Sequence, residues 1–220
     1  HSKGGRWWAK IAQRLPVAGD VILGLLLAVL FAMALYPMFA IPGKLRDRWN
    51  PTLPPSLNGM VFMDYLLLHE NEGSVPLATD AEVIRWLQEN VEGSPVIMEK
   101  NAEIEYIRWG NRMSIYTGLP TVVGWRWHQA QQRMVMPPGT VESRQQDVAD
   151  FYTTPDAQRA WQILEKYDVS YVVVTPYEEI YMTTLRATAK FDELVGEGRL
   201  EVAFETSRQD AVVYRVIQDD

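Results

Sequence analysis

VSYVVVT, residues 169–175, is the stretch that decides the fold of this chain. It is a run rich in β-branched residues that ends at Pro176, which is the pattern of a strand buried on both faces. Such strands lie inside sheets that are covered by helices on both sides. We therefore expect an α/β domain built around this strand.

The segments on either side of this strand alternate between helical and extended patterns. Four helices are expected, in the apolar stripe Ala81, Ile84, Leu87 and Val91 behind a Thr79–Asp80 N-cap, and over residues 143–152, 155–167 and 177–194. Four further strands are expected, in PVIMEK (95–100), RMSIYTG (112–118), LEVAFETS (200–207) and AVVYRVI (211–217), the last two joined as a hairpin around residues 208–210. This alternation predicts a three-layer α/β domain with a mixed sheet.

An uncharged run of 21 residues, 21–41, lies near the start of the sequence. As a helix rising 1.5 Å per residue, it matches the ~30 Å hydrocarbon thickness of a bilayer. A signal peptide has a shorter apolar region, and a buried core helix that is apolar all round needs a larger protein around it. We therefore expect one N-terminal transmembrane helix. Four basic residues precede it and three follow it, a difference too small to decide its orientation.

Charge is unevenly distributed along the chain, whose net charge is −7 over 220 residues. Residues 1–48 hold 7 basic and 2 acidic side chains, whereas residues 78–220 hold 14 basic and 23 acidic ones. Such an acidic body argues against nucleic acid as a partner, because affinity for nucleic acid comes from clustered Lys and Arg. The composition predicts four segments: an amphipathic juxtamembrane segment (1–20), the transmembrane helix (21–41), a proline-rich linker with a short helix in 59–73 (42–77), and the α/β domain (78–220).

The common catalytic and metal-binding motifs are absent. There is no GxGxxG, GxxxxGK[ST], GxSxG or HExxH, and a chain with no Cys has neither disulfides nor thiolate metal sites. His69 and Glu70 with Glu72 offer ligands for a hard cation, but a solvated linker is the favoured interpretation. We expect no metal and no cofactor in this chain, and the sequence identifies no catalytic residue.

Aromatic, amide and arginine side chains gather in residues 111–133, NRMSIYTGLPTVVGWRWHQAQQR. Trp rings stack on sugars and lipid headgroups, Gln and His donate and accept hydrogen bonds, and Arg pairs with phosphate as a fork. This mixture predicts a site for a glycan, a sugar phosphate or a membrane-proximal partner. The alternative, weighed equally on composition, is that the tryptophans pack and the polar residues are solvated. The candidate substrate-binding residues are Arg112, Tyr116, Trp125, Arg126, Trp127, His128, Gln129 and Arg133.

The order of several segments resembles the C-terminal part of the YYY family of multi-pass bacterial and archaeal membrane proteins. The segments are YPMFAIPGKLRDRW (36–49), DAEVIRWLQENVEGSPVIME (80–99), residues 111–133, VESRQQDVADFYTT (141–154), LEKYDVSYVVV (164–174) and AVVYRV (211–216). The match covers nearly all of residues 36–217, and YTGLPTVVGW (116–125) is its most specific piece. LEKYDVSYVVV after an aromatic, glycine-containing loop is also similar to extracytoplasmic domains of polytopic lipid-linked glycosyltransferases, including the catalytic subunit of oligosaccharyltransferase.

The resemblance implies an extracytoplasmic tail domain at the cell membrane, attached to a multi-span body that uses polyprenyl-phosphate sugars. The catalytic acid and any metal would then lie in loops that precede this sequence. On this hypothesis the chain contributes to substrate or acceptor binding, with the lipid bilayer and a lipid-linked sugar or glycan as partners. A WWDYG-type motif is lacking, so the acceptor stays unassigned. One alternative is a non-enzymatic, single-span accessory subunit that docks on other membrane subunits, and another is a solute-sensing or cell-surface domain.

Overall fold

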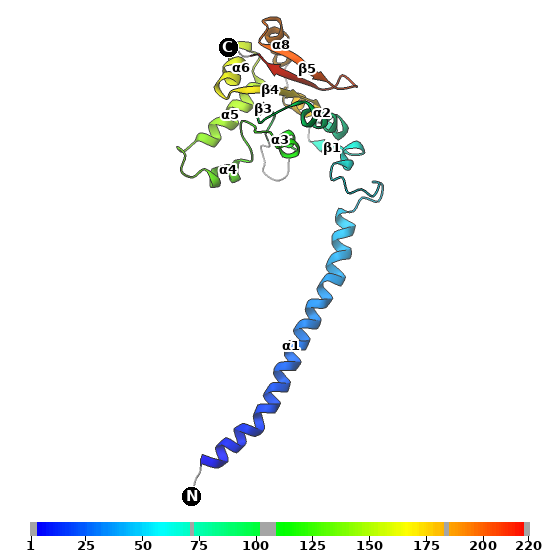
Figure 1. Ribbon diagram of the computed structural model, residues 1–220, viewed down its shortest axis with the longest axis vertical. Helices are drawn as coiled ribbons and strands as arrows, with labels where there is room; N and C mark the ends of the chain where they lie inside the picture. Colours follow the sequence, from blue (N-terminus) through cyan, green and yellow to red (C-terminus); the bar gives the residue numbers. More distant parts are fainter. Residues whose placement is uncertain (1–3, 71–72, 102–108, 183–184, 218–220) are drawn as a thin grey trace. The chain divides into compact units, whose positions relative to one another are not determined.

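The structure, a computed structural model, describes residues 4–70, 73–101, 109–182 and 185–217 of the chain. The chain divides into two compact units, residues 1–54 and 55–220 (Figure 1). The division falls inside the segment predicted as a linker.

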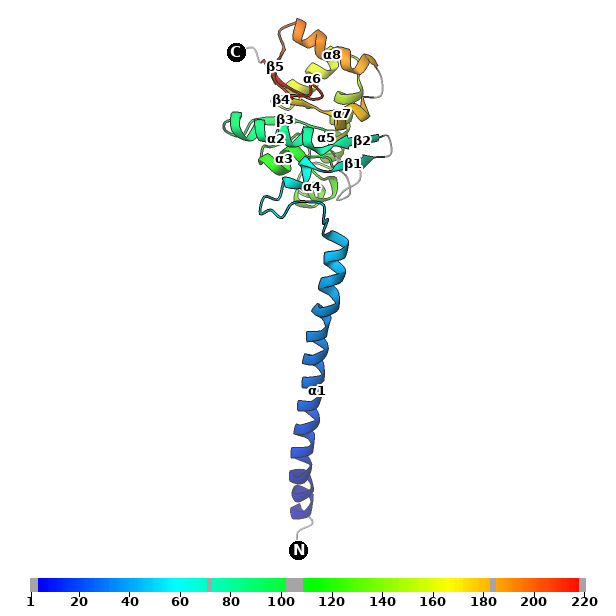
Figure 2. The same ribbon diagram turned by 90° about the vertical axis from the view of Figure 1, so that its right-hand side faces the viewer.

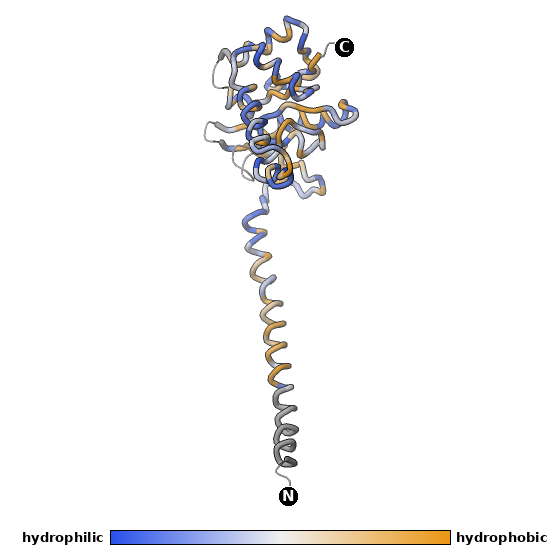
Figure 3. The backbone as a smooth tube through the Cα atoms, turned by 90° about the vertical axis from the view of Figure 1, so that its left-hand side faces the viewer, coloured by the Kyte–Doolittle hydropathy of each residue, from blue (hydrophilic) through white to orange (hydrophobic). Residues whose placement is uncertain are grey.

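Helix α1 (Gly4–Arg48) forms most of the first unit. Its section Gly19–Arg48 has a mean hydropathy of 2.5 in its most apolar part, and no residue of that part is buried. Figure 3 shows most of this section in orange, with blue in its last turns. By length and composition the helix can cross a membrane, and it contains the run 21–41 that the sequence singled out.

The second unit contains a mixed four-stranded sheet with helices on both faces, which confirms the predicted fold class. The strand order is β3-β4-β6-β5, with β3 parallel to β4 and the other pairs antiparallel; β1 and β2 form a separate antiparallel hairpin. The elements in chain order are η1 (Val61–Asp64), β1 (Leu67–Glu70), β2 (Gly73–Pro76), α2 (Leu77–Asn90), β3 (Val96–Met98), α3 (Arg112–Thr117), α4 (Arg126–Gln132), α5 (Thr140–Thr153), α6 (Ala157–Lys166), β4 (Val169–Val174), α7 (Pro176–Tyr181), α8 (Leu185–Gly196), β5 (Leu200–Glu205) and β6 (Val212–Val216).

Strand β4 separates two hydrophobic cores, as its sequence predicts. Successive side chains of a strand point to opposite faces. Val172 and Val174 lie in the core formed with α5, α6 and α8, whereas Val173 lies in the core formed with η1, α2 and α3. Figure 2 shows α6 and α8 on one side of the sheet and α2 and α3 on the other. The domain therefore has three layers, and the hairpin predicted between β5 and β6 is also confirmed.

The strand predicted for residues 112–118 is wrong, because this segment forms the short helix α3. Asn111 precedes the helix in the left-handed conformation (φ 63°), which Asn tolerates better than most residues. The Glu99 carboxylate then accepts the N–H groups of Met113 (2.8 Å) and Ser114 (2.9 Å), which have no partner inside the helix. The helix thus depends on a residue that follows β3, a partner that no local pattern reveals.

Three further element boundaries differ from the prediction. Helix α2 begins at Leu77, so Asp80 lies within it and is not part of an N-cap. The single helix expected over 177–194 is two helices, α7 and α8, separated by residues that include the undescribed 183–184. The short helix expected in 59–73 is reduced to η1, and the chain then enters β1. Met63 of η1 is fully buried, so this short helix packs against the domain.

Candidate functional site

Polar residues are concentrated where the two parallel strands end. The carboxyl ends of β3 and β4 lie at the same edge of the sheet, since these strands are parallel. Glu99, Lys100 and Asn101 follow β3, and Thr175 and Glu178 follow β4; all five are buried. In open α/β sheets, ligands bind outside the carboxyl ends of the strands. This edge is therefore a candidate binding site.

One guanidinium group holds the buried part of this edge together. The Arg112 side chain is 1% exposed, and its Nε donates to Asp80 Oδ2 (2.7 Å). Its Nη2 donates to Glu178 Oε2 (2.7 Å) and to Thr175 Oγ1 (2.7 Å). Burial alone would lower the pKa of Arg112, but the carboxylates of Asp80 and Glu178 hold it well above its usual value. Arg112 therefore stays charged and ties α2, α3 and α7 together.

Glu99 is the titratable group of this edge. Its carboxylate is fully buried and accepts the two N–H groups at the start of α3. Burial raises the pKa of Glu99 to about 7, against the opposing effects of Arg112 and of the Ser114 and Met113 N–H groups. Because the free carboxyl group titrates near 4.5, Glu99 changes charge in the neutral range only when the domain is folded.

A polar groove of about 330 Å³ starts beside the end of β3. Its walls are Lys100 and Asn101 after β3, Arg126 at the start of α4, and one face of α5. The α5 residues are spaced three and four apart, so they share that face: Glu142, Gln145, Gln146 and Ala149. The volume lies within the range of small-ligand sites.

The groove offers both donors and acceptors of hydrogen bonds. The amides of Asn101, Gln145 and Gln146 can do both. Arg126 Nη2 and Glu142 Oε1 lie 3.2 Å apart, and both side chains are about half exposed. The pKa of Glu142 is lowered by its own backbone N–H and by Arg126, so this carboxylate is ionised at neutral pH. This combination suits a hydroxyl-rich ligand that carries at most a small charge.

The structure divides the predicted binding residues into a buried and an accessible group. Arg112 lies in the buried ion cluster that it forms with Asp80 and Glu178. The half-buried Tyr116 packs its ring against Trp109 (centroids 6.0 Å apart). Trp125, His128 and Gln129 are half-buried, whereas Arg126, Trp127 and Arg133 are exposed. The rings of Trp125 and Trp127 lie 5.7 and 6.3 Å from the His128 ring, so these three do come together.

Gly124, just before α4, lies close to the Gln129 side chain. A Cβ at this position would lie 2.9 Å from the Gln129 side-chain nitrogen. Only Arg126 among the predicted residues lines the polar groove.

Several residues of the site were missed in the sequence. They are the groove residues Lys100, Asn101, Glu142, Gln145 and Gln146, and the buried acids Asp80, Glu99 and Glu178. The glutamines did carry a signal, because they form a polar face at helical spacing in the predicted helix 143–152. The buried acids carried none that a single sequence reveals, because their partners are distant in the chain.

Comparisons with known proteins give a limited result. No family model matches the chain, and no curated protein does. The chain is similar in structure to the C-terminal globular domain of an oligosaccharyltransferase from Archaeoglobus fulgidus, with a TM-score of 0.37 and 15% sequence identity over 62% of this chain and 95% of that chain. The resemblance to the YYY family stays a prediction.

Proposed function

We propose that this chain is the C-terminal membrane-anchored domain of a polyprenyl-phosphate-sugar-dependent glycosyltransferase, in which it binds substrate or acceptor outside the cytoplasm. The catalytic acid would lie elsewhere in the enzyme. The observation that carries the proposal is the polar groove at the carboxyl end of β3, which adjoins the aromatic start of α4 through Arg126. The sequence resemblance and the apolar helix α1 support it.

The groove chemistry fits a sugar attached to a phosphate. Each sugar hydroxyl donates and accepts, and the Gln145 and Gln146 amides match both roles. The Arg126 guanidinium can pair with a phosphate oxygen, at the expense of its exposed ion pair with Glu142, which costs little to break. The Trp127 ring, 56% exposed and next to Arg126 in the sequence, offers an apolar face for a sugar ring or a prenyl chain.

The candidate residues then take two roles. Trp125, Arg126, Trp127, His128, Gln129 and Arg133 are proposed to contact the substrate or to shape its site. Arg112 and Tyr116 are proposed to stabilise the site without contacting the substrate, because Arg112 is ion-paired at the start of α3 and Tyr116 packs on Trp109. In this proposal the buried ion cluster of Arg112, Asp80 and Glu178 positions the residues that line the groove.

The test is a calorimetric titration of the full chain in nanodiscs with polyprenyl-phosphate-mannose and polyprenyl-phosphate-glucose. We expect saturable binding of one of them, weakened at least tenfold, or about 1.4 kcal/mol, in the double variant Gln145→Ala/Gln146→Ala. The thermal unfolding transition of this variant should be unchanged. Gln162→Ala, at an exposed glutamine of α6, is the matched control and should bind as the wild type does.

Two outcomes would contradict the proposal. In the first, the double variant binds as tightly as the wild-type chain. In the second, the wild-type chain binds neither compound and instead co-purifies in fixed stoichiometry with other membrane proteins. The second outcome would favour the accessory-subunit alternative.

A further inference from the structure

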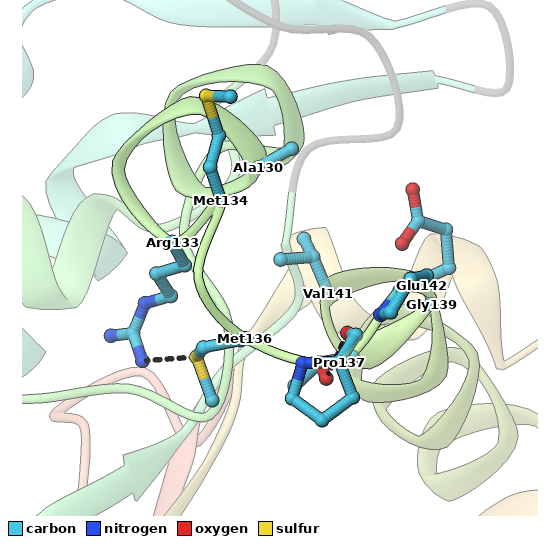
Figure 4. A pocket seen from close by; sticks show the side chains of 10 residues that line it. Ala130, Arg133, Met134, Met136, Pro137, Gly139, Val141 and Glu142 are labelled. Atoms are coloured by element: carbon cyan, nitrogen blue, oxygen red, sulfur yellow. Dashed lines mark hydrogen bonds between the residues drawn. The ribbon is translucent and has the colours of Figure 1, made fainter.

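Helix α4 and the turn after it, residues 133–139, carry large apolar side chains that are exposed. None of the residues of α4 is buried. Trp127 is 56% exposed, Met134 82% and Val135 98%. Figure 4 shows Met134 pointing away from Pro137 and Val141, while the Arg133 guanidinium reaches the sulfur of Met136. The turn thus presents two large apolar side chains, Met134 and Val135, to its surroundings, and Trp127 on α4 is a third exposed apolar residue.

The charge around this turn differs from that of the rest of the domain. Residues 78–220 hold 23 acidic and 14 basic side chains, yet residues 111–141 contain no Asp or Glu. Of the basic residues near the turn, Arg126 is paired with Glu142, whereas Arg133 is exposed and contacts only a thioether among the interactions described for it. The turn therefore combines exposed apolar residues with the exposed Arg133, and the Glu142 carboxylate that lines the same hollow is paired with Arg126. An exposed cation beside apolar side chains complements an anionic and amphipathic partner.

A short segment joins the candidate membrane helix to the second unit. The apolar section of α1 ends at Arg48 and the second unit begins at Pro55. The six residues between them span at most about 20 Å even when fully extended. A short tether gives the domain a high effective concentration at the membrane surface, so even weak surface binding is populated.

We propose that Met134 and Val135 insert into the boundary between headgroups and acyl chains of the bilayer that α1 would cross, with Arg133 on the phosphates of anionic lipids. Met and Val gain from burial in the acyl region, and a basic residue near an anionic surface contributes about 1 kcal/mol. Interfacial binding by apolar and basic residues together is also how amphipathic helices lie on membranes. The inference goes beyond the proposed function, since it concerns the lipid surface and not the sugar.

The absence of cysteine from the chain permits a direct test. Val135→Cys is labelled with an environment-sensitive fluorophore in the full chain, reconstituted in nanodiscs that contain anionic lipid and a lipid with a shallow acyl-chain quencher. We expect a blue-shifted emission and lipid quenching several-fold stronger than for Val202→Cys, a matched control at a 54% exposed valine of β5. Adding Arg133→Gln to the labelled chain should weaken the quenching in anionic discs and leave it unchanged in zwitterionic discs.

Two results would overturn the inference. One is lipid quenching at position 135 no stronger than at position 202. The other is a probe shielded from both lipid and aqueous quenchers, which would show that protein covers the turn. All three substitutions are at exposed positions, where the free energy of unfolding changes by about 0.5 kcal/mol or less. Val135 lies outside the residues proposed for substrate, so quenching and sugar-lipid titration can fail independently.

Discussion

Residues 111–133 contain two regions with the same kinds of side chain and opposite surroundings. The first region, around α3, buries Arg112 between Asp80 and Glu178. The second region, around α4, exposes Arg126, Arg133 and Trp127. Composition alone treats the two regions as one binding segment. The comparison teaches that Arg112 in the first region holds the edge of the sheet in place, whereas Arg126, Arg133 and Trp127 in the second are accessible to a ligand or a membrane.

The largest expected effect is in the buried region. Arg112→Met leaves two buried carboxylates without their counterion, so the free energy of unfolding should fall by about 3–5 kcal/mol. In Arg126→Met, at a half-exposed position, the free energy of unfolding should fall by no more than about 1 kcal/mol. Urea unfolding of the full chain, followed by circular dichroism, measures both. Equal losses of unfolding free energy in the two variants would contradict the division into a buried and an exposed region.

The next effect is a pH dependence from Glu99. Its folded pKa of about 7 lies above the unfolded value of 4.5, so its contribution to stability is full below about pH 4.5 and is lost as the pH rises through 7. The change amounts to something on the order of 3 kcal/mol. Urea unfolding between pH 4.5 and 8 should therefore show the wild-type chain losing stability relative to Glu99→Gln.

A control for this titration comes from the exposed region. The pKa of Glu142 is lowered, so its contribution is lost as the pH falls. The difference between the wild-type chain and Glu142→Gln should therefore be flat through the neutral range, and should fall only as the pH drops through 4.5 and below. A stability difference for Glu99→Gln that does not vary with pH would show that Glu99 does not titrate in the neutral range.

The smallest effect on stability is expected at Trp127. Trp127→Ala removes a ring that is 56% exposed, and the free energy of unfolding should change by about 0.5 kcal/mol or less. Binding of polyprenyl-phosphate sugar by the same preparation should weaken several-fold. Tyr65→Ala, at a 59% exposed aromatic residue, is the matched control and should affect neither quantity. A loss of the unfolding transition in Trp127→Ala would make this ring part of the core.

Local pattern was sufficient for much of the fold. Strand β4, the hairpin of β5 and β6, and helices α5 and α6 each bury a regular stripe of their own residues, which is visible in the sequence. Helix α3 was not predictable in this way, because Glu99 and the left-handed Asn111 fix its start.

The candidate site was predictable only in part. The segment that contains Arg126 and Trp127 was identified by its composition. The burial of Arg112 was hidden, because its partners Asp80 and Glu178 lie 32 and 66 residues away along the chain. Gln145 and Gln146 were missed because a polar helix face reads as solvated unless another element forms a wall opposite it.

Hydrogen exchange of the full chain in nanodiscs, with and without polyprenyl-phosphate sugar, tests the division of residues 111–133 most directly. We predict that α3 is protected in both conditions, because its amides are held by Glu99 and the buried cluster. Added protection should appear in α4 and the first half of α5, which border the groove. Ligand-induced protection confined to α3, with none in α4 or α5, would contradict the assignment of binding to the exposed region.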